Sequence, residues 1–142
     1  MPLGALSFRL RPMAFHIDEM LVLEIGQARF PDGTKIETST PIGRVVVVES
    51  FPARLNWHVA VKFTADTRST LSFDADVIVP RGPRSVAHLK FVAEPGPGRE
   101  EFPLPVFTAP EHGMYRVHLY VNGATTPSAS EAILVNVAAS LA

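Results

Sequence analysis

Five histidines and a pair of closely spaced aspartates are the side chains of this sequence best suited to metal or acid–base chemistry. The histidines are His16, His58, His88, His112 and His118. Imidazoles on adjacent strands can bind zinc or copper, with Asp74, Asp76 or Glu111 as a further ligand. No two histidines have the short spacing of a local metal motif, and HExxH is absent. We therefore interpret the histidines as surface imidazoles and expect no metal or other cofactor.

A less favoured interpretation places several of the histidines in one site. Strand alternation places His58, His88 and His118 on outward faces of their strands. His58 and His118 would lie within cross-strand reach if their strands were neighbours in one sheet. A histidine-based metal protein or enzyme thus stays an alternative hypothesis.

Other catalytic patterns are missing. Asp74 and Asp76 share one strand face at about 7 Å, a separation compatible with an inverting glycosidase, but a solvated outer face explains the pair better. There is no Gly-x-Ser-x-Gly, and Pro95-Gly96-Pro97-Gly98 lacks the lysine that a phosphate-binding loop needs. We expect no enzymatic activity.

Composition narrows the class of protein. The 142 residues fit one domain, and 46% hydrophobic residues exclude intrinsic disorder. A net charge of −1 argues against a general nucleic-acid binder. No run of about 18 apolar residues is present for a membrane helix. With no cysteine for disulfides, the expectation is a cytoplasmic protein with neither a nucleic-acid nor a membrane partner.

The elements that position these side chains are strands. Apolar and polar residues alternate over 55–63, 71–79 and 115–122, and thirteen prolines argue against long helices. The run 45–48 has valine on both faces. Further strands are predicted at 15–25, 86–92, 102–107 and 131–137, and a loop at 94–101.

Turn sequences such as Pro31-Asp32-Gly33 and Asn122-Gly123 separate these strands. The pattern predicts a single Ig-like antiparallel β-sandwich of seven or eight strands over residues 13–142, preceded by an N-terminal arm, residues 1–12. The predicted inward residues are Leu55, Trp57, Val59, Phe63, Phe73, Val77, Val79, Leu89, Phe91, Tyr115, Val117 and Leu119.

The order of several short motifs carries a family resemblance. Ser50-Phe51-Pro52-Ala53 follows the valine-rich run, Gly113-Met114-Tyr115 begins a later strand, and Asn122-Gly123 ends it. Between roughly residues 45 and 137 the chain resembles a bacterial family of small Ig-like sandwich proteins, catalogued as a domain of unknown function, number 6941. The resemblance implies a fold and no chemistry.

The functional hypothesis is a non-enzymatic binding or assembly module that recognises a protein partner and forms homo-oligomers. Its contacts would be a sheet face and loop tips. The residues chosen are the outward apolar Val46, Val48 and Ile78, the loop-tip Arg81 and Arg84, and the outward His58 and His118. The alternatives are a structural subunit of a phage or phage-like particle, the histidine-based metal protein or enzyme, and a carbohydrate-binding sandwich. This last alternative has only Tyr120 as an outward aromatic.

Overall fold

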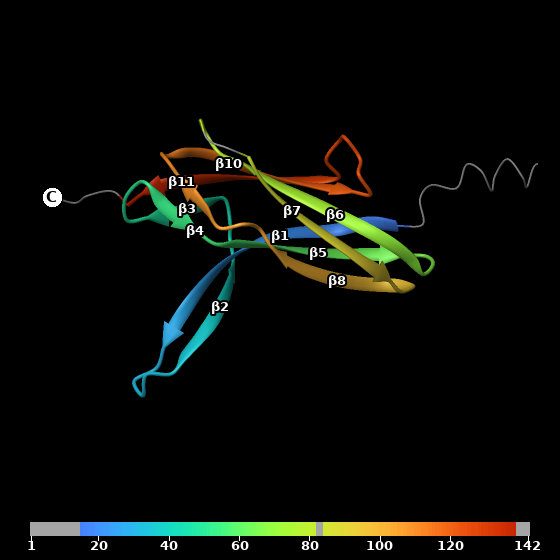
Figure 1. The fold of residues 1–142 in the computed structure, drawn as a ribbon, viewed down its shortest axis with the longest axis horizontal. Helices are drawn as coiled ribbons and strands as arrows, with labels where there is room; N and C mark the ends of the chain where they lie inside the picture. Colours follow the sequence, from blue (N-terminus) through green and yellow to red (C-terminus); the bar gives the residue numbers. More distant parts are fainter. Residues whose placement is uncertain (1–14, 82–83, 139–142) are drawn as a thin grey trace, which may run out of the picture.

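The computed structural model describes residues 15–81 and 84–138. Over these two ranges the chain is built from eleven strands and contains no helix, so no described segment is a helix able to cross a membrane (Figure 1). The prediction of an all-β fold is confirmed. The predicted N-terminal arm, residues 1–12, lies outside the described residues. The strands are β1 (Phe15–Arg29), β2 (Lys35–Pro41), β3 (Val45–Val48), β4 (Ala53–Leu55), β5 (Trp57–Ala65), β6 (Ser69–Ile78), β7 (Ser85–Ala93), β8 (Gly96–Pro103), β9 (Phe107–Ala109), β10 (Gly113–Val121) and β11 (Ala129–Val137).

Two sheets pack face to face. The first has the strand order β2-β1-β5-β8 and the second the order β3-β11-β10-β6-β7, while β4 and β9 form a separate two-stranded sheet (Figure 1). All neighbouring pairs are antiparallel except β3, which lies parallel to β11. The second sheet carries the outer face on which several predicted site residues lie.

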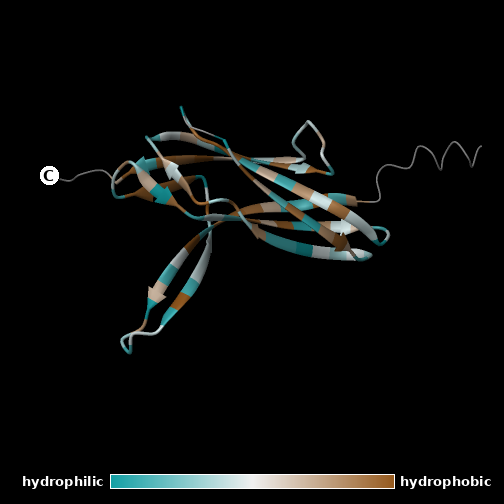
Figure 2. Cartoon of the chain, in the orientation of Figure 1, coloured by the Kyte–Doolittle hydropathy of each residue, from teal (hydrophilic) through white to brown (hydrophobic). Residues whose placement is uncertain are grey.

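The core lies between the two sheets, and both contribute buried apolar side chains to it. Hydrophobic and hydrophilic residues alternate along many of the strands (Figure 2). Trp57, Phe73 and Tyr115 are fully buried. The ring of Phe73 lies 4.9 Å from that of Phe91 and 6.1 Å from that of Phe63, centroid to centroid. Ten of the twelve predicted inward side chains are buried, and Leu89 and Phe91 on edge strand β7 are partly buried against the core.

The observed strands differ from the predicted ones in three segments. The segment predicted as a loop at 94–101 is largely strand β8, an edge strand that pairs with β5; its Gly, Pro and charged residues gave no apolar alternation, and only Phe102 of the strand is buried. The segment predicted as a strand at 102–107 contains only the end of β8 and the first residue of β9. Strand β2 was not predicted, because none of its side chains is buried and its sequence has no apolar alternation.

Strand β1 changes partner along its length. From Phe15 to Glu24 it pairs with β5, and from Leu23 to Arg29 it pairs with β2. Beyond the hydrogen bond from the amide of Ile25 to the carbonyl of Asn56, β1 and β2 have only each other as partners. The two strands therefore leave the sheets as a projecting hairpin, residues 25–39, which we call the hairpin arm (Figure 1).

Candidate functional site

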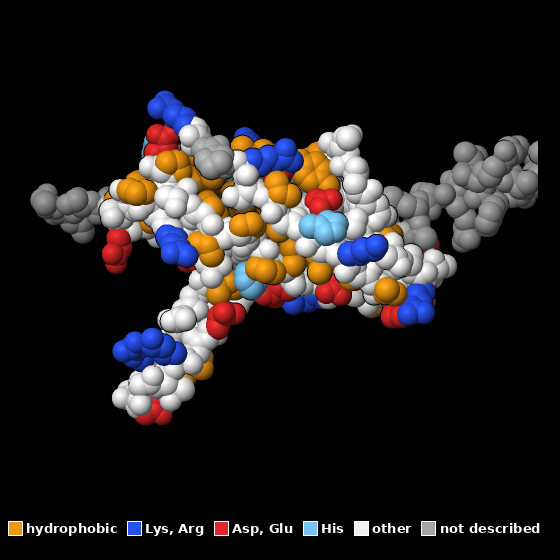
Figure 3. Space-filling model, in the orientation of Figure 1, with side chains coloured by type: hydrophobic (Ala, Val, Ile, Leu, Met, Phe, Trp, Pro, Cys, Tyr) orange, Lys and Arg blue, Asp and Glu red, His pale blue; other side chains and the backbone are white. Residues whose placement is uncertain are grey.

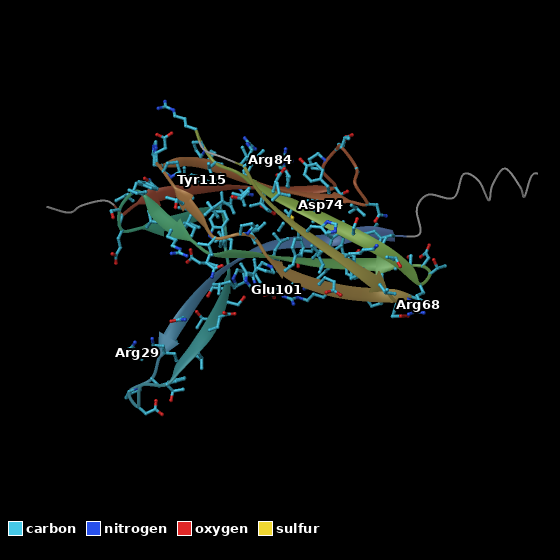
Figure 4. The ribbon with its side chains drawn as sticks, in the orientation of Figure 1. Arg29, Arg68, Asp74, Arg84, Glu101 and Tyr115 are labelled. Carbon is cyan, nitrogen blue, oxygen red and sulfur yellow. The ribbon has the colours of Figure 1, made fainter. Side chains whose placement is uncertain are left out.

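Three of the predicted site residues gather on the outer face of the second sheet. His118 on β10 and Asp76 on β6 are cross-strand partners, and Ile78 pairs with Arg116 one row further along. Arg84, which precedes β7, reaches over this face toward Asp76 (Figure 4). The sequence thus identified part of a real cluster, but Asp76, its central residue, was interpreted as one of a solvated pair.

Asp76 is the one buried charged side chain among the described residues, with 1% of its surface exposed. An Arg84 guanidinium nitrogen forms an ion pair with its Oδ2, and the Nδ1 of His118 lies 3.5 Å from its Oδ1. Neither carboxylate oxygen receives a well-aligned hydrogen bond. A buried carboxylate needs such compensating charge, so Arg84 fastens the β6–β7 connection to the sheet.

A second histidine–aspartate pair lies one row along. The Nδ1 of His88 lies 2.6 Å from the Oδ1 of Asp74, and both belong to the same outer face. Asp74, Arg84 and Tyr120 line an open hollow of about 410 Å³ beside these pairs. Within the described ranges, no three histidine, aspartate or glutamate side chains are grouped as metal ligands. The cluster is a polar surface built from separate pairs.

His58 belongs to the other sheet. It lies on β5, and its Nδ1 is 3.0 Å from the Oε2 of Glu101 on β8. This hydrogen bond, together with Arg99, holds the pKa of Glu101 below its ordinary value. The expectation that His58 and His118 approach each other across neighbouring strands is wrong, because β5 and β10 lie in different sheets.

The remaining predicted residues divide between core and surface. Val46 and Val48 were expected to point outward, but Val46 is buried and Val48 packs partly against the core, while Val45 and Val47 are exposed. The reason is that β3 is an edge strand with one buried face, so its valine run gave no parity signal. Arg81 is 86% exposed in its side chain and lies 3.5 Å from Glu111.

The hairpin arm is a feature that the sequence analysis did not identify as a site. No residue from 24 to 41 is buried, and the arm has a sheet packed against neither of its faces. An isolated two-stranded hairpin is marginally stable in water. A projecting arm of this kind has its surface available for a partner. The turn at 31–33 was its only sequence signal, and the polar strand after it gave none.

Two cations face each other at the end of the arm. Arg29 on β1 and Lys35 on β2 are directly opposite in the register, so their side chains share one face of the ribbon. Like charges in this position repel each other. Within the described part of the chain neither forms an ion pair. Five basic residues of the body do, namely Lys62, Arg68, Arg81, Arg84 and Arg99, while among the described residues Arg44, Arg54, Lys90 and Arg116 do not. Figure 3 shows this cationic group on the projecting hairpin.

Three carboxylates lie on or beside the same arm. Glu37 follows Lys35 by two residues on the same face, and Glu24 lies where the arm joins the body. Asp32 lies in the turn, where its Oδ1 accepts a hydrogen bond from the amide of Thr34 at 2.9 Å. That bond lowers the pKa of Asp32, so its carboxylate is charged at neutral pH. Over residues 25–39 the two cations, Arg29 and Lys35, are balanced by two carboxylates, Asp32 and Glu37, so the arm has a formal charge of zero and its positive charge is local to the Arg29–Lys35 pair.

Comparisons with known proteins assign no family. No family model matches the chain, and no curated protein matches it. Among solved structures, the alkylpurine DNA glycosylase AlkC of Pseudomonas fluorescens, bound to DNA containing an abasic site analog, is similar over 87% of this chain, with a TM-score of 0.49 and 19% identity. The chain spans 31% of the length of that protein.

Two expectations from the sequence are corrected by this comparison. A protein partner was expected and nucleic acid was excluded, whereas the solved structure contains DNA. Recognition of a protein partner through a sheet face and loop tips is not proposed again.

Proposed function

We propose that this protein is a nucleic-acid-binding module whose contact element is the hairpin arm. The observation that carries the proposal is the unpaired Arg29–Lys35 pair on a projecting ribbon. Two opposed cations without a carboxylate partner are relieved by an anion, and the phosphate backbone of nucleic acid supplies closely spaced anions. Arg29 and Lys35 would hold phosphates and set the position of the arm.

The dimensions of the arm support this assignment. The major groove of B-form DNA admits a two-stranded β-ribbon, and ribbons are an established means of reading DNA. The segment of β1 from Glu24 to Arg29 extends about 17 Å at the usual rise per residue of a strand. Gln27 on this segment and Thr38 on β2 add hydrogen-bonding side chains at exposed or half-exposed positions.

The neutral composition is compatible with this proposal because charge is unevenly distributed. On the body, most basic side chains lie against carboxylates, for example Arg68 against Glu94 at 3.0 Å. Such pairs cancel in the net charge and contribute little field at a distance. The arm also sums to zero over residues 25–39, so a phosphate would meet the local Arg29–Lys35 pair and not a net positive charge.

The test is a binding titration of labelled DNA and RNA by fluorescence anisotropy at low salt. Replacing Arg29 and Lys35 together by alanine should weaken binding at least tenfold and reduce the slope of log K against log salt by about 1.8, as two lost phosphate contacts require. Arg68→Ala is the matched control, because Arg68 lies far from the arm and is already paired (Figure 4). Equal losses in both variants, or no binding by the wild-type protein, would refute the proposal.

The finer fold assignment is also a proposal. The Tyr115 hydroxyl donates to the carbonyl of Glu111 at 2.5 Å, and buried Trp57 packs edge-on against Phe107. A tyrosine bonded to the backbone just upstream and a buried tryptophan are typical of Ig-like sandwiches. These features support an Ig-like classification and membership of the family named above. The proposal involves no catalysis and keeps the expected cytoplasmic location.

A further inference from the structure

The tip of the hairpin arm presents an aromatic ring to solvent. Phe30 is 47% exposed, and it belongs neither to the core cluster nor to any aromatic pair among the described residues. Exposing a phenylalanine forgoes the stabilisation that its burial would give. On the opposite strand, Ile36 follows Lys35 and is likewise exposed, at 45%. The end of the arm therefore combines an apolar surface with two cations.

The backbone holds Phe30 in a fixed position. Its amide donates to the carbonyl of Thr34 at 2.8 Å, and its carbonyl accepts from the amide of Gly33 at 2.9 Å. Pro31 restricts the backbone after it, and Gly33 has a φ of 91°, which favours glycine. This is a closed turn and not a loose loop. The backbone of the turn is thus ordered before binding and has little conformational entropy left to lose.

Arg29 and Phe30 are adjacent, and strand alternation turns them to opposite faces of the ribbon. Ala28 and Ile36 share the apolar face, because they are cross-strand partners. Long basic side chains can reach around the edge of a ribbon. A nucleotide at the tip can thus have its base on one face and its phosphates held from the other.

We infer that Phe30 stacks on an unpaired base, and that the arm prefers single-stranded or locally unpaired nucleic acid to a regular duplex. This inference rests on the proposed function. Aromatic rings beside cations are how single strands are held, since every base has a face for stacking. In a regular duplex those faces are already covered by neighbouring bases, and inserting a ring between them requires unstacking.

The test compares three labelled probes with the full chain: a single strand, its perfect duplex, and the same duplex with a central bulge. The wild-type protein should bind the single strand and the bulge more tightly than the perfect duplex. Phe30→Leu, which keeps an apolar side chain without a flat ring, should weaken binding of the single strand about tenfold. Phe30→Tyr should retain the binding, and Met114→Leu on the body is a control for exposed apolar residues.

The outcomes separate this inference from the proposed function. If Phe30→Leu binds all three probes like the wild type while the Arg29 and Lys35 double variant fails, the arm binds nucleic acid without stacking and the inference is wrong. Equal affinity of the wild type for duplex and single strand overturns it also. If the wild-type protein binds none of the probes, the proposed function itself fails. A Phe30→Trp variant adds a direct readout, because stacking on a base should quench the fluorescence of the new tryptophan. The signal of buried Trp57 should stay constant as a background.

Discussion

The carboxylate of Asp76 lies beneath the guanidinium of Arg84, and this ion pair joins the interior strand β6 of the second sheet to the residue that precedes β7. The two partners are unequal: Asp76 is buried, whereas 59% of the Arg84 side chain is exposed. The Asp76 carboxylate is shielded from water and depends on Arg84 for compensating charge, whereas much of the Arg84 side chain remains in contact with water. The ion pair therefore contributes to the stability of this face of the second sheet, and it is separate from the hairpin arm.

Arg84→Ala should destabilise the fold by about 1–3 kcal/mol, because it leaves a buried carboxylate without its charge partner. The exposure of Arg84 keeps the value below that of a fully buried pair. Urea denaturation measures the change. Arg81→Ala, three residues earlier and almost fully exposed, should change stability by less than about 0.5 kcal/mol.

A double-mutant cycle checks the mechanism. With Asp76→Asn already in place, Arg84→Ala should cost clearly less, since no buried charge is left to compensate. Additive costs would show that Arg84 acts through its packing and not through Asp76.

The close approach of Gly98 to the ring of Phe63 gives a second prediction. A Cβ added to Gly98 would lie 2.6 Å from two ring carbons of Phe63, its cross-strand partner. The ring of Phe63 has little room to move, because it packs against those of Phe15 and Phe91. Gly98→Ala should therefore cost about 1–3 kcal/mol by overpacking.

Gly43→Ala is the matched control, since nothing lies within 4 Å of the added Cβ there. It should be neutral or slightly stabilising. Thermal or urea unfolding of both variants decides the point, and a Gly98→Ala protein as stable as the Gly43 variant would count against the close contact.

Alternating strands were predictable because each has one buried face. Trp57 and Val59 on β5 and Tyr115 and Val117 on β10 show the pattern that the core imposes. Strands with no buried face carry no such signal, which is why β2 was missed although its turn was recognised. The valines of β3 gave the opposite error, because four identical side chains cannot indicate which of them face the core.

The candidate sites show a second limit of sequence reasoning. His58 and His118 have the same outward parity, yet strand order places them in different sheets. The alternation of residues along a strand shows which side chains share a face of that strand. It does not show which strands lie side by side, because strand pairing is long-range and is not contained in the local pattern. Net charge has a similar limit, since it sums over paired and unpaired charges alike. The Arg29–Lys35 pair is visible only when the register of the hairpin is known.

The hydrogen bond between His58 and Glu101 predicts a pH dependence of stability. The pKa of Glu101 is lower in the folded protein than its ordinary value of 4.5, chiefly because of His58. Its contribution is therefore present above the ordinary value and is lost as the pH falls through the lower, folded value. The difference in unfolding free energy between the wild type and Glu101→Gln should shrink as the pH is lowered from 7 to 3.

Glu100→Gln serves as the control on the same strand, because Glu100 forms no ion pair among the described residues. Urea midpoints across this pH range give the measurement. A difference for Glu101→Gln that stays constant with pH would contradict the assigned role of its charge.

The charge on Asp32 gives the last prediction, which concerns nucleic-acid binding by the arm. Asp32 lies between the strands that carry Arg29 and Lys35, and its lowered pKa keeps it ionised near any phosphate bound there. Asp32→Asn removes this repulsion, while the amide oxygen can still accept the hydrogen bond from Thr34 that holds the turn. Affinity for DNA should rise about two- to fivefold at low salt and converge on that of the wild type as salt is added. Asp66→Asn, in the turn between β5 and β6, removes the same charge from the body and should leave binding nearly unchanged. Anisotropy titrations at two salt concentrations measure both variants. If Asp32→Asn weakens binding while the turn stays folded, the carboxylate itself contacts the ligand, and the phosphate-binding role of the arm is wrong.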